Sequence, residues 1–158
     1  MSSRQPLSKS ELENYAISLL SRREYGAEEL LMKLNSRSDS ESAQAVLLWL
    51  QEQNLQSDSR YARLLLRSKS QRGLGPLRIR QEMQQKRLAS DMIGLAFEEC
   101  EQDWFELARQ VYLKKFPDAL SSDPKDRARR QRFLHYRGFT GDQIGYALEQ
   151  GHQECTNY

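Results

Sequence analysis

Residues 72–83 read Arg-Gly-Leu-Gly-Pro-Leu-Arg-Ile-Arg-Gln-Glu-Met, which is typical of a tight turn followed by a short amphipathic helix. Pro76 follows Gly75, and proline is well tolerated in the first turn of a helix because its missing N–H would be unsatisfied there. Ile79 and Met83 are four residues apart, so both side chains lie on one face of that helix. The stretch therefore predicts a helix that begins at Pro76 and buries one apolar face.

The same pattern recurs along the chain. Gly26, Leu30 and Leu34 precede Gly75, Ile79 and Met83 by 49 positions, Tyr15-Ala16 precedes Tyr61-Ala62 by 46, and residues 88–98 precede the similar residues 139–149 by 51. Repeats of about this length usually stack so that each contacts only its neighbours. The alternative interpretation is a single helical bundle with accidental internal similarity.

The residue types favour helices over strands. The chain of 158 residues contains 23 Leu but only 8 Val, Ile and Thr together, and β-branched residues are those that fill strands. The expected apolar stripes share helical spacing: Leu12, Ala16, Leu19 and Leu20; Ala27, Leu30, Leu31 and Leu34; Ala43, Val46, Leu47 and Leu50; Tyr61, Ala62, Leu65 and Leu66. Short helices are marginal alone, so these stripes must pack against one another.

We therefore predict an all-α fold of three tandem three-helix repeats in an elongated array, either straight or curved. The predicted parts are a flexible N-terminus at 1–7, repeats at 8–54, 55–101 and 102–151, and a frayed tail at 152–158.

Two helix starts carry the sequence signature of a capping box. Ser10 with Glu13 and Thr140 with Gln143 each place a hydroxyl three residues before a long acceptor side chain. We expect one helix to begin at each site.

The sequence lacks the residue patterns that are typical of several classes of protein. No apolar run approaches the ~20 residues of a membrane span, and the first residues lack the apolar core of a signal peptide, so we expect a cytoplasmic protein. Cys100 and Cys155 fit neither a disulfide framework nor a zinc spacing. Residues 73–80 lack the lysine and hydroxyl residue of a phosphate-binding loop. His135 and His152 have no partner at catalytic or metal-ligand spacing. We expect no metal, no cofactor and no enzymatic activity.

The net charge is only +2, but the charges are segregated. Residues 60–87 contain nine bases and one acid, residues 90–106 contain six acids and no base, and residues 125–137 contain six bases and one acid. We expect the first block to contact a nucleic-acid backbone or acidic residues of a partner, while an ordinary solvated face is the alternative. The candidate contact residues are Arg60, Arg63, Arg67, Lys69, Arg72, Arg78, Arg80, Lys86 and Arg87.

These residues resemble a known family. Leu55-Gln-Ser-Asp58 with Arg60-Tyr-Ala62, followed by the stretch 72–83, closely resembles the central signature of the RecX regulatory proteins, and residues 88–98 and 132–139 resemble that family's later repeats. The resemblance covers about residues 10–150. The chain departs from the family pattern at two places. Ser57-Asp58 stands where many members carry two adjacent acids, and Gly26-Ala27 stands in the first repeat instead of Gly-Pro.

The resemblance implies three tandem three-helix repeats and a regulator without catalytic chemistry. Such a protein would lie in the groove of the RecA filament on single-stranded DNA. There it would inhibit filament growth, ATPase, recombinase and coprotease activities, and so modulate DNA repair and the SOS response. The implied partners are the RecA filament and single-stranded DNA, the latter bound weakly or through the filament. No coiled-coil heptad demands a dimer, so we expect a monomer.

Two other functions remain open from the residues alone. A direct DNA-binding module is one, because short three-helix units resemble helix-turn-helix domains. The low net charge of +2 argues against it. A helical adaptor for an unrelated protein, using the acidic residues 90–106, is the other.

Overall fold

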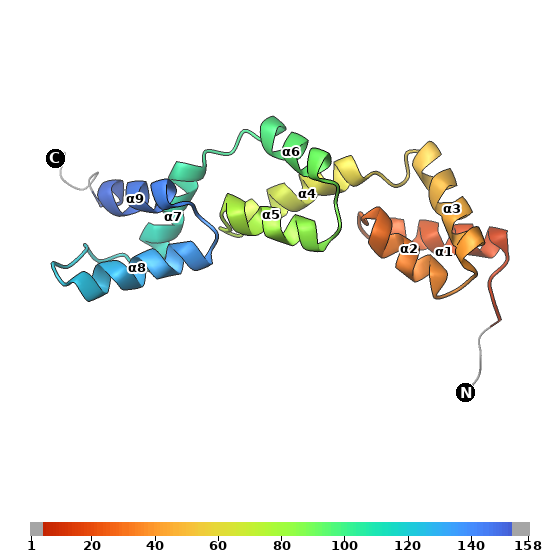
Figure 1. Ribbon diagram of the computed structural model, residues 1–158, viewed down its shortest axis with the longest axis horizontal. Coiled ribbons are helices and arrows are strands. Elements are labelled where there is room, and N and C mark those ends of the chain that lie inside the picture. The colour runs from red at the N-terminus through yellow and green to blue at the C-terminus, as the bar shows by residue number, and fades with distance from the viewer. Residues whose placement is uncertain (1–4, 153–158) are drawn as a thin grey trace. The chain divides into compact units, whose positions relative to one another are not determined.

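The computed structural model describes residues 5–152, which fold into helices joined by short turns (Figure 1). The helices are α1 (Lys9–Leu20), α2 (Ala27–Asn35), α3 (Ser40–Glu52), α4 (Asp58–Gln71), α5 (Pro76–Gln85), α6 (Ser90–Glu99), α7 (Trp104–Lys115), α8 (Pro124–Tyr136) and α9 (Gly141–Gln150). There is no β-strand among these described residues, and the predicted all-α fold is confirmed. The predicted flexible N-terminus and frayed tail lie mostly outside the described residues, at 1–4 and 153–158.

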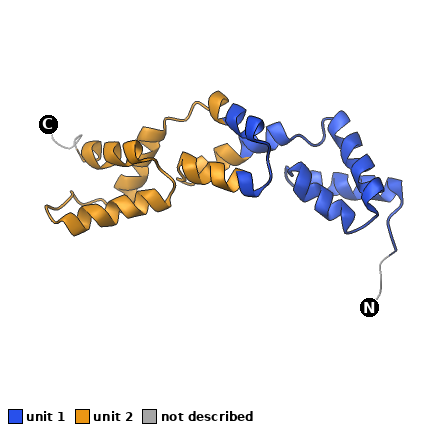
Figure 2. Ribbon diagram, in the orientation of Figure 1, with its two compact units in different colours: residues 1–64, 84–96 blue, residues 65–83, 97–158 orange. Residues whose placement is uncertain are grey.

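The chain divides into two compact units, residues 1–64 with 84–96 and residues 65–83 with 97–158 (Figure 2). The division falls inside α4, so the predicted second repeat, at 55–101, contributes residues to both units. The repeat boundaries expected at 8–54, 55–101 and 102–151 stay a prediction.

The helix starts follow local capping chemistry. Thr140 and Gln143 form the predicted capping box at the start of α9. The capping box predicted for Ser10 is wrong, because α1 begins one residue earlier, at Lys9. Ser8 is the cap instead: its Oγ accepts a hydrogen bond from the Glu11 N–H at 3.2 Å, and its own N–H donates to Glu11 Oε1 at 3.2 Å. Both serines precede a glutamate by three residues, so the sequence signature alone fits either.

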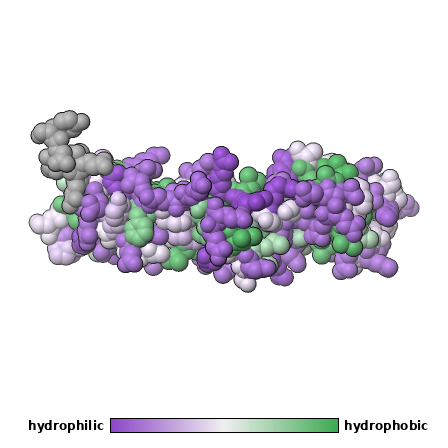
Figure 3. All heavy atoms as spheres, turned by 90° about the horizontal axis from the view of Figure 1, so that it is seen from above, coloured by the Kyte–Doolittle hydropathy of each residue, from purple (hydrophilic) through white to green (hydrophobic). Residues whose placement is uncertain are grey.

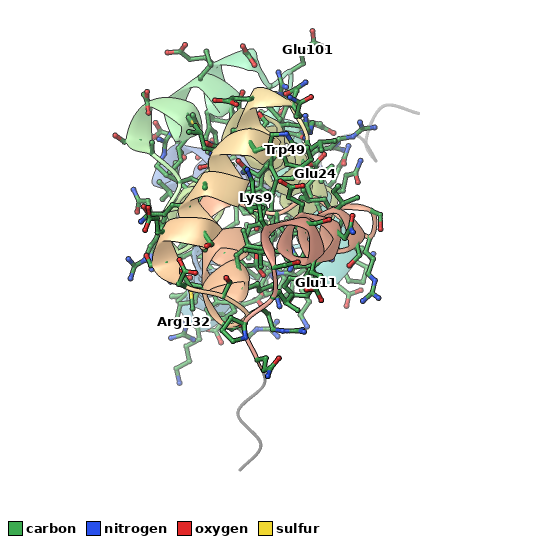
Figure 4. All side chains as sticks on the ribbon, turned by 90° about the vertical axis from the view of Figure 1, so that its right-hand side faces the viewer. Lys9, Glu11, Glu24, Trp49, Glu101 and Arg132 are labelled. Atoms are coloured by element: carbon green, nitrogen blue, oxygen red, sulfur yellow. The ribbon has the colours of Figure 1, made fainter. Side chains whose placement is uncertain are left out.

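The core of the first unit is built from the predicted stripes of α1, α2 and α3. These helices pack on one another and bury Leu12, Ala16, Leu30, Leu34, Ala43, Val46 and Leu50, together with Tyr25 from the turn before α2. Trp49 packs against the edge of this core from α3, where Figure 4 labels it. One face of each helix is therefore buried, as the spacing of three and four residues requires.

The core of the second unit lies among α7, α8 and α9, which also pack on one another. Its buried residues are Ala108, Tyr112, Phe116, Leu134, Phe139, Ile144, Ala147 and Leu148. Arg130 is buried beside them, with only 4% of its surface exposed. Its guanidinium donates to the Tyr112 hydroxyl at 2.9 Å and to the Asp118 carbonyl at 2.9 Å, so the buried charge is hydrogen-bonded.

Candidate functional site

Residues 56–58 join the second repeat to the turn before α2 in the first unit. The Asp58 carboxylate accepts a hydrogen bond from the Ala27 N–H at 2.8 Å, which satisfies a free amide at the start of α2. The Gln56 amide, 2% exposed, donates to the Tyr25 carbonyl at 3.1 Å and to Asp58 Oδ1 at 3.0 Å. These long-range bonds give the segment a structural role.

We call the contact between residues 56–58 and the turn before α2 the first joint. Arg60 adds further contacts to it. Its Nε pairs with Glu24 Oε1 at 2.6 Å, and Figure 4 labels Glu24. The same guanidinium donates to the carbonyls of Asn54 and Leu55, each at 3.2 Å. Arg60 therefore has structural partners within the protein, in addition to any contact with a binding partner.

The other candidate cations of the first unit are exposed. Arg63 lies on the surface of α4, and Lys86 and Arg87 lie just after α5. Arg87 adopts a positive φ of 58°, a conformation that ends a helix. The first unit thus presents these three side chains to solvent, although Arg63 also makes contacts within the chain.

In the second unit, Glu82 is shared by two of the candidate cations. Lys69 Nζ lies 3.3 Å from Glu82 Oε2, and Arg78 Nε lies 3.5 Å from Glu82 Oε1. Arg80 is exposed, with its guanidinium carbon 4.5 Å from the centre of the Phe97 ring. A single carboxylate therefore offsets part of the positive charge carried by α4 and α5.

A second joint connects the start of α5 to the turn before α9, and main-chain atoms of the second unit make it. The Gly75 N–H donates to the Arg137 carbonyl at 2.8 Å, and the Leu77 N–H donates to the Gly138 carbonyl at 3.0 Å. Gly138 has a φ of +97°, and a Cβ there would collide with Arg78. A Cβ on Gly75 would in turn collide with Gly138. Glycine is required at both positions because the two backbones approach so closely.

A surface pocket of about 400 Å³ opens next to this joint. Four bases line it: Arg72, Lys114, Lys115 and Arg137. Leu107, Val111 and Phe133 supply apolar lining. Arg72 is an exposed member of the candidate contact set. Arg67, another exposed member, is not part of the pocket lining. Lys114 and Lys115 are not among the contact residues predicted from the sequence, because they lie between the charge blocks, in the last turn of a helix whose apolar spacing predicts a core element.

Hydrophilic side chains cover most of the face shown in Figure 3, and apolar side chains form small separate patches there. Within residues 5–152 no helix is long and apolar enough to cross a membrane. The same residues hold no cluster of three or more His, Cys, Asp or Glu that could bind a metal ion. Cys100 is a free thiol, and Cys155 lies outside the described residues.

Comparison with known proteins identifies the family. Residues 57–96 match the second three-helix domain of RecX, and residues 101–148 match the third. The regulatory protein RecX of Vibrio campbellii is 45% identical over 134 residues, covering 84% of this chain and 86% of the relative. The chain belongs to the RecX family. The regulatory protein RecX of Pseudomonas fluorescens is 41% identical over the same shares of the two chains.

Solved RecX structures share the fold. A crystal structure of RecX from Lactobacillus salivarius superposes with a TM-score of 0.78 at 18% identity, covering 90% of this chain and 96% of that one. A second crystal structure of a regulatory protein RecX gives a TM-score of 0.73 at 20% identity, covering 94% and 81%. The all-α fold of tandem three-helix repeats is thereby confirmed.

The residues that suggested RecX have identifiable structural tasks. Gln56 and Asp58 hold the first joint, while Gly75 makes the second and Pro76 begins α5. Pro76 corresponds to Ala27 of the first repeat. Ala27 needs Asp58 to accept its N–H, whereas proline has no N–H to satisfy. Much of the RecX signature in this chain therefore builds the joints, and the role of the basic residues stays a prediction.

Proposed function

We propose that this chain is a non-enzymatic regulator that binds the RecA filament on single-stranded DNA. It inhibits growth of the filament and its ATPase, recombinase and coprotease activities, and so modulates DNA repair and the SOS response. Membership of the RecX family, at 45% identity over most of both chains, is the observation that carries the proposal. We further propose that it acts in the cytoplasm as a monomer.

The candidate contact residues support this proposal through charge. Arg67, Arg72 and Arg80 of the second unit are exposed, and arginine forms forked hydrogen bonds with carboxylates and phosphates. A filament offers the same binding site on every subunit. Weak contacts made by several repeats therefore add through effective concentration, which gives tight binding without any single strong contact.

ATP hydrolysis by RecA on single-stranded DNA, measured while this protein is titrated in, tests the proposal. We expect strong inhibition at substoichiometric ratios, because one bound molecule can block the addition of further subunits. Unchanged hydrolysis at a large excess of the protein would contradict the proposal and favour a direct DNA-binding or adaptor function.

A charge-reversed variant tests the contact surface separately. Arg67→Glu with Arg80→Glu should raise the concentration needed for half-inhibition about tenfold or more, since each reversal replaces attraction with repulsion. The matched control is Lys125→Glu with Arg127→Glu, which reverses two exposed bases at the start of α8. Equal losses for both variants would show only a general charge effect.

A further inference from the structure

We propose that the basic pocket of the second unit binds one nucleotide of a single-stranded nucleic acid. The exposed bases Arg72, Lys114 and Lys115 hold the phosphates, and the apolar lining accepts the base. The proposal deepens the proposed function by assigning a contact to the DNA rather than to the RecA protein.

The charge around the pocket selects an anion. Two lysines and two arginines line it, and no aspartate or glutamate does so among the described residues. This differs from the neighbouring surface of α4 and α5, where Glu82 pairs with Lys69 and Arg78. Four cations beside one small hollow repel one another, and a polyanion relieves that repulsion while releasing its own counterions.

The apolar part of the lining favours a nucleotide over a simple anion. The guanidinium carbon of Arg137 lies over the Phe133 ring, 5.3 Å from the ring centre. The Phe133 and Phe116 rings pack in a T-shaped arrangement with their centres 5.5 Å apart. Arg137 is also held by a hydrogen bond of 3.2 Å to the Arg72 carbonyl. A guanidinium fixed on an aromatic ring presents a flat cationic surface, on which a nucleobase stacks well.

The size of the pocket agrees with this ligand. A volume of about 400 Å³ falls within the range of small-ligand sites. A nucleotide brings a phosphate and a flat, largely apolar base in one covalent unit. A carboxylate side chain would satisfy the cations but leave Val111 and Leu107 in contact with water. The observations therefore favour a nucleic-acid strand over an acidic segment of a protein.

Binding of the full-length protein to a fluorescein-labelled oligo(dT), without RecA, tests this site at low salt by fluorescence anisotropy. Lys114→Gln with Lys115→Gln should weaken binding about tenfold and reduce the slope of log K against log salt by about 1.4, since each lost phosphate contact contributes ~0.7 on a single strand. Gln110→Glu, which adds a carboxylate to the lining from an exposed position of α7, should also weaken binding. The control is the Lys125→Gln, Arg127→Gln variant, which removes two bases outside the pocket.

Unchanged oligo(dT) affinity and salt slope in both pocket variants would overturn the proposal. Equal losses in the control variant would overturn it as well, because they would show a general effect of charge. If the pocket variants kept oligo(dT) binding but lost binding to RecA without DNA, the pocket would take an acidic protein segment instead. Oligo(dT) binding without RecA can be unaffected by the pocket substitutions even though the protein inhibits RecA. A negative result for this site is therefore distinguishable from a negative result for the proposed function.

Discussion

Leu66 shows how strongly a single position in α4 can matter. It retains 3% exposure, whereas the preceding Leu65 is half-buried and Leu64 is 48% exposed. A helix turns by 100° at each residue, so adjacent leucines face different surroundings. The cost of truncating each side chain should follow this order.

Leu66→Ala should lower the free energy of unfolding by about 2–4 kcal/mol, because it leaves a cavity in a packed interior. Leu64→Ala, the exposed control two residues earlier, should change it by less than about 0.5 kcal/mol. Urea unfolding followed by circular dichroism measures both. A loss below about 1 kcal/mol for Leu66→Ala would mean that this face of α4 is not buried in solution.

Glu82→Gln should strengthen filament binding. The substitution removes the carboxylate that pairs with Lys69 and Arg78, and so frees both cations for an anionic partner. The gain should be roughly twofold to fivefold, the scale of partly exposed ion pairs. Titration of the RecA ATPase measures it, and weaker inhibition would instead mean that Glu82 is needed to position Arg78.

At the scale of elements, the joint between α5 and the turn before α9 depends on glycine. Gly138→Ala should destabilise the protein by at least about 2 kcal/mol, because alanine is strained at a φ of +97° and its Cβ meets Arg78. Gly94→Ala in α6 is the control: a Cβ there meets nothing within 4 Å, so helix propensity should stabilise the protein by about 0.5–1 kcal/mol. Thermal melts of the two variants should therefore shift in opposite directions, and a neutral Gly138→Ala would argue against the joint.

The start of α8 should make stability depend on pH. Asp126 accepts hydrogen bonds from Arg129 at 2.9 Å, from the Ser121 N–H at 3.1 Å and from Arg130 at 3.1 Å. These donors, Arg129 foremost, lower the pKa of Asp126 well below its ordinary value. A lowered pKa means that the stabilisation is complete above the unfolded value of about 3.9 and is lost as the pH falls below it.

Asp126→Asn should therefore flatten the decline of the urea midpoint between about pH 5 and pH 2. Glu101→Gln, a change at an exposed acid in the loop before α7, should leave that decline as it is in the parent protein. The prediction would be contradicted if the urea midpoint of the Asp126→Asn variant declined at low pH as steeply as that of the parent protein.

Helical spacing and punctuation predicted much of this architecture. The glycine-proline turn before α5 and the Thr140 cap are visible in the sequence because their chemistry is local. The predicted apolar stripe of α4 includes both Leu65 and Leu66, but the structure buries only Leu66 and leaves Leu65 half-buried, a difference that periodicity alone cannot decide. Bonds such as Gln56 to Tyr25 join residues 31 positions apart, and no spacing rule reveals them. The pocket likewise draws on α7 and α8 as well as the end of α4, so only folding brings its four bases together.

At the scale of the whole molecule, the balance of basic and acidic residues determines how strongly the protein should bind nucleic acid by itself. The chain carries 24 basic residues against 22 acidic ones, so general attraction to DNA is weak. Its affinity for the RecA filament should exceed its affinity for bare single-stranded DNA by about a hundredfold or more, because repeated contacts act together on the filament. Anisotropy titrations of one labelled oligonucleotide, with and without RecA and a nonhydrolysable ATP analogue, compare the two. Equal affinities would favour the direct DNA-binding function.

The main-chain joint also makes two amides useful as reporters. Gly75 and Leu77 lie at the start of α5, where amide protons usually lack a helical acceptor and exchange quickly with solvent deuterium. Here they are bonded to the carbonyls of Arg137 and Gly138. Their exchange rates therefore record how often α5 and the turn before α9 part, independently of whether either helix unwinds. Slower exchange at these two sites on engagement of a ligand would show that the ligand closes this joint.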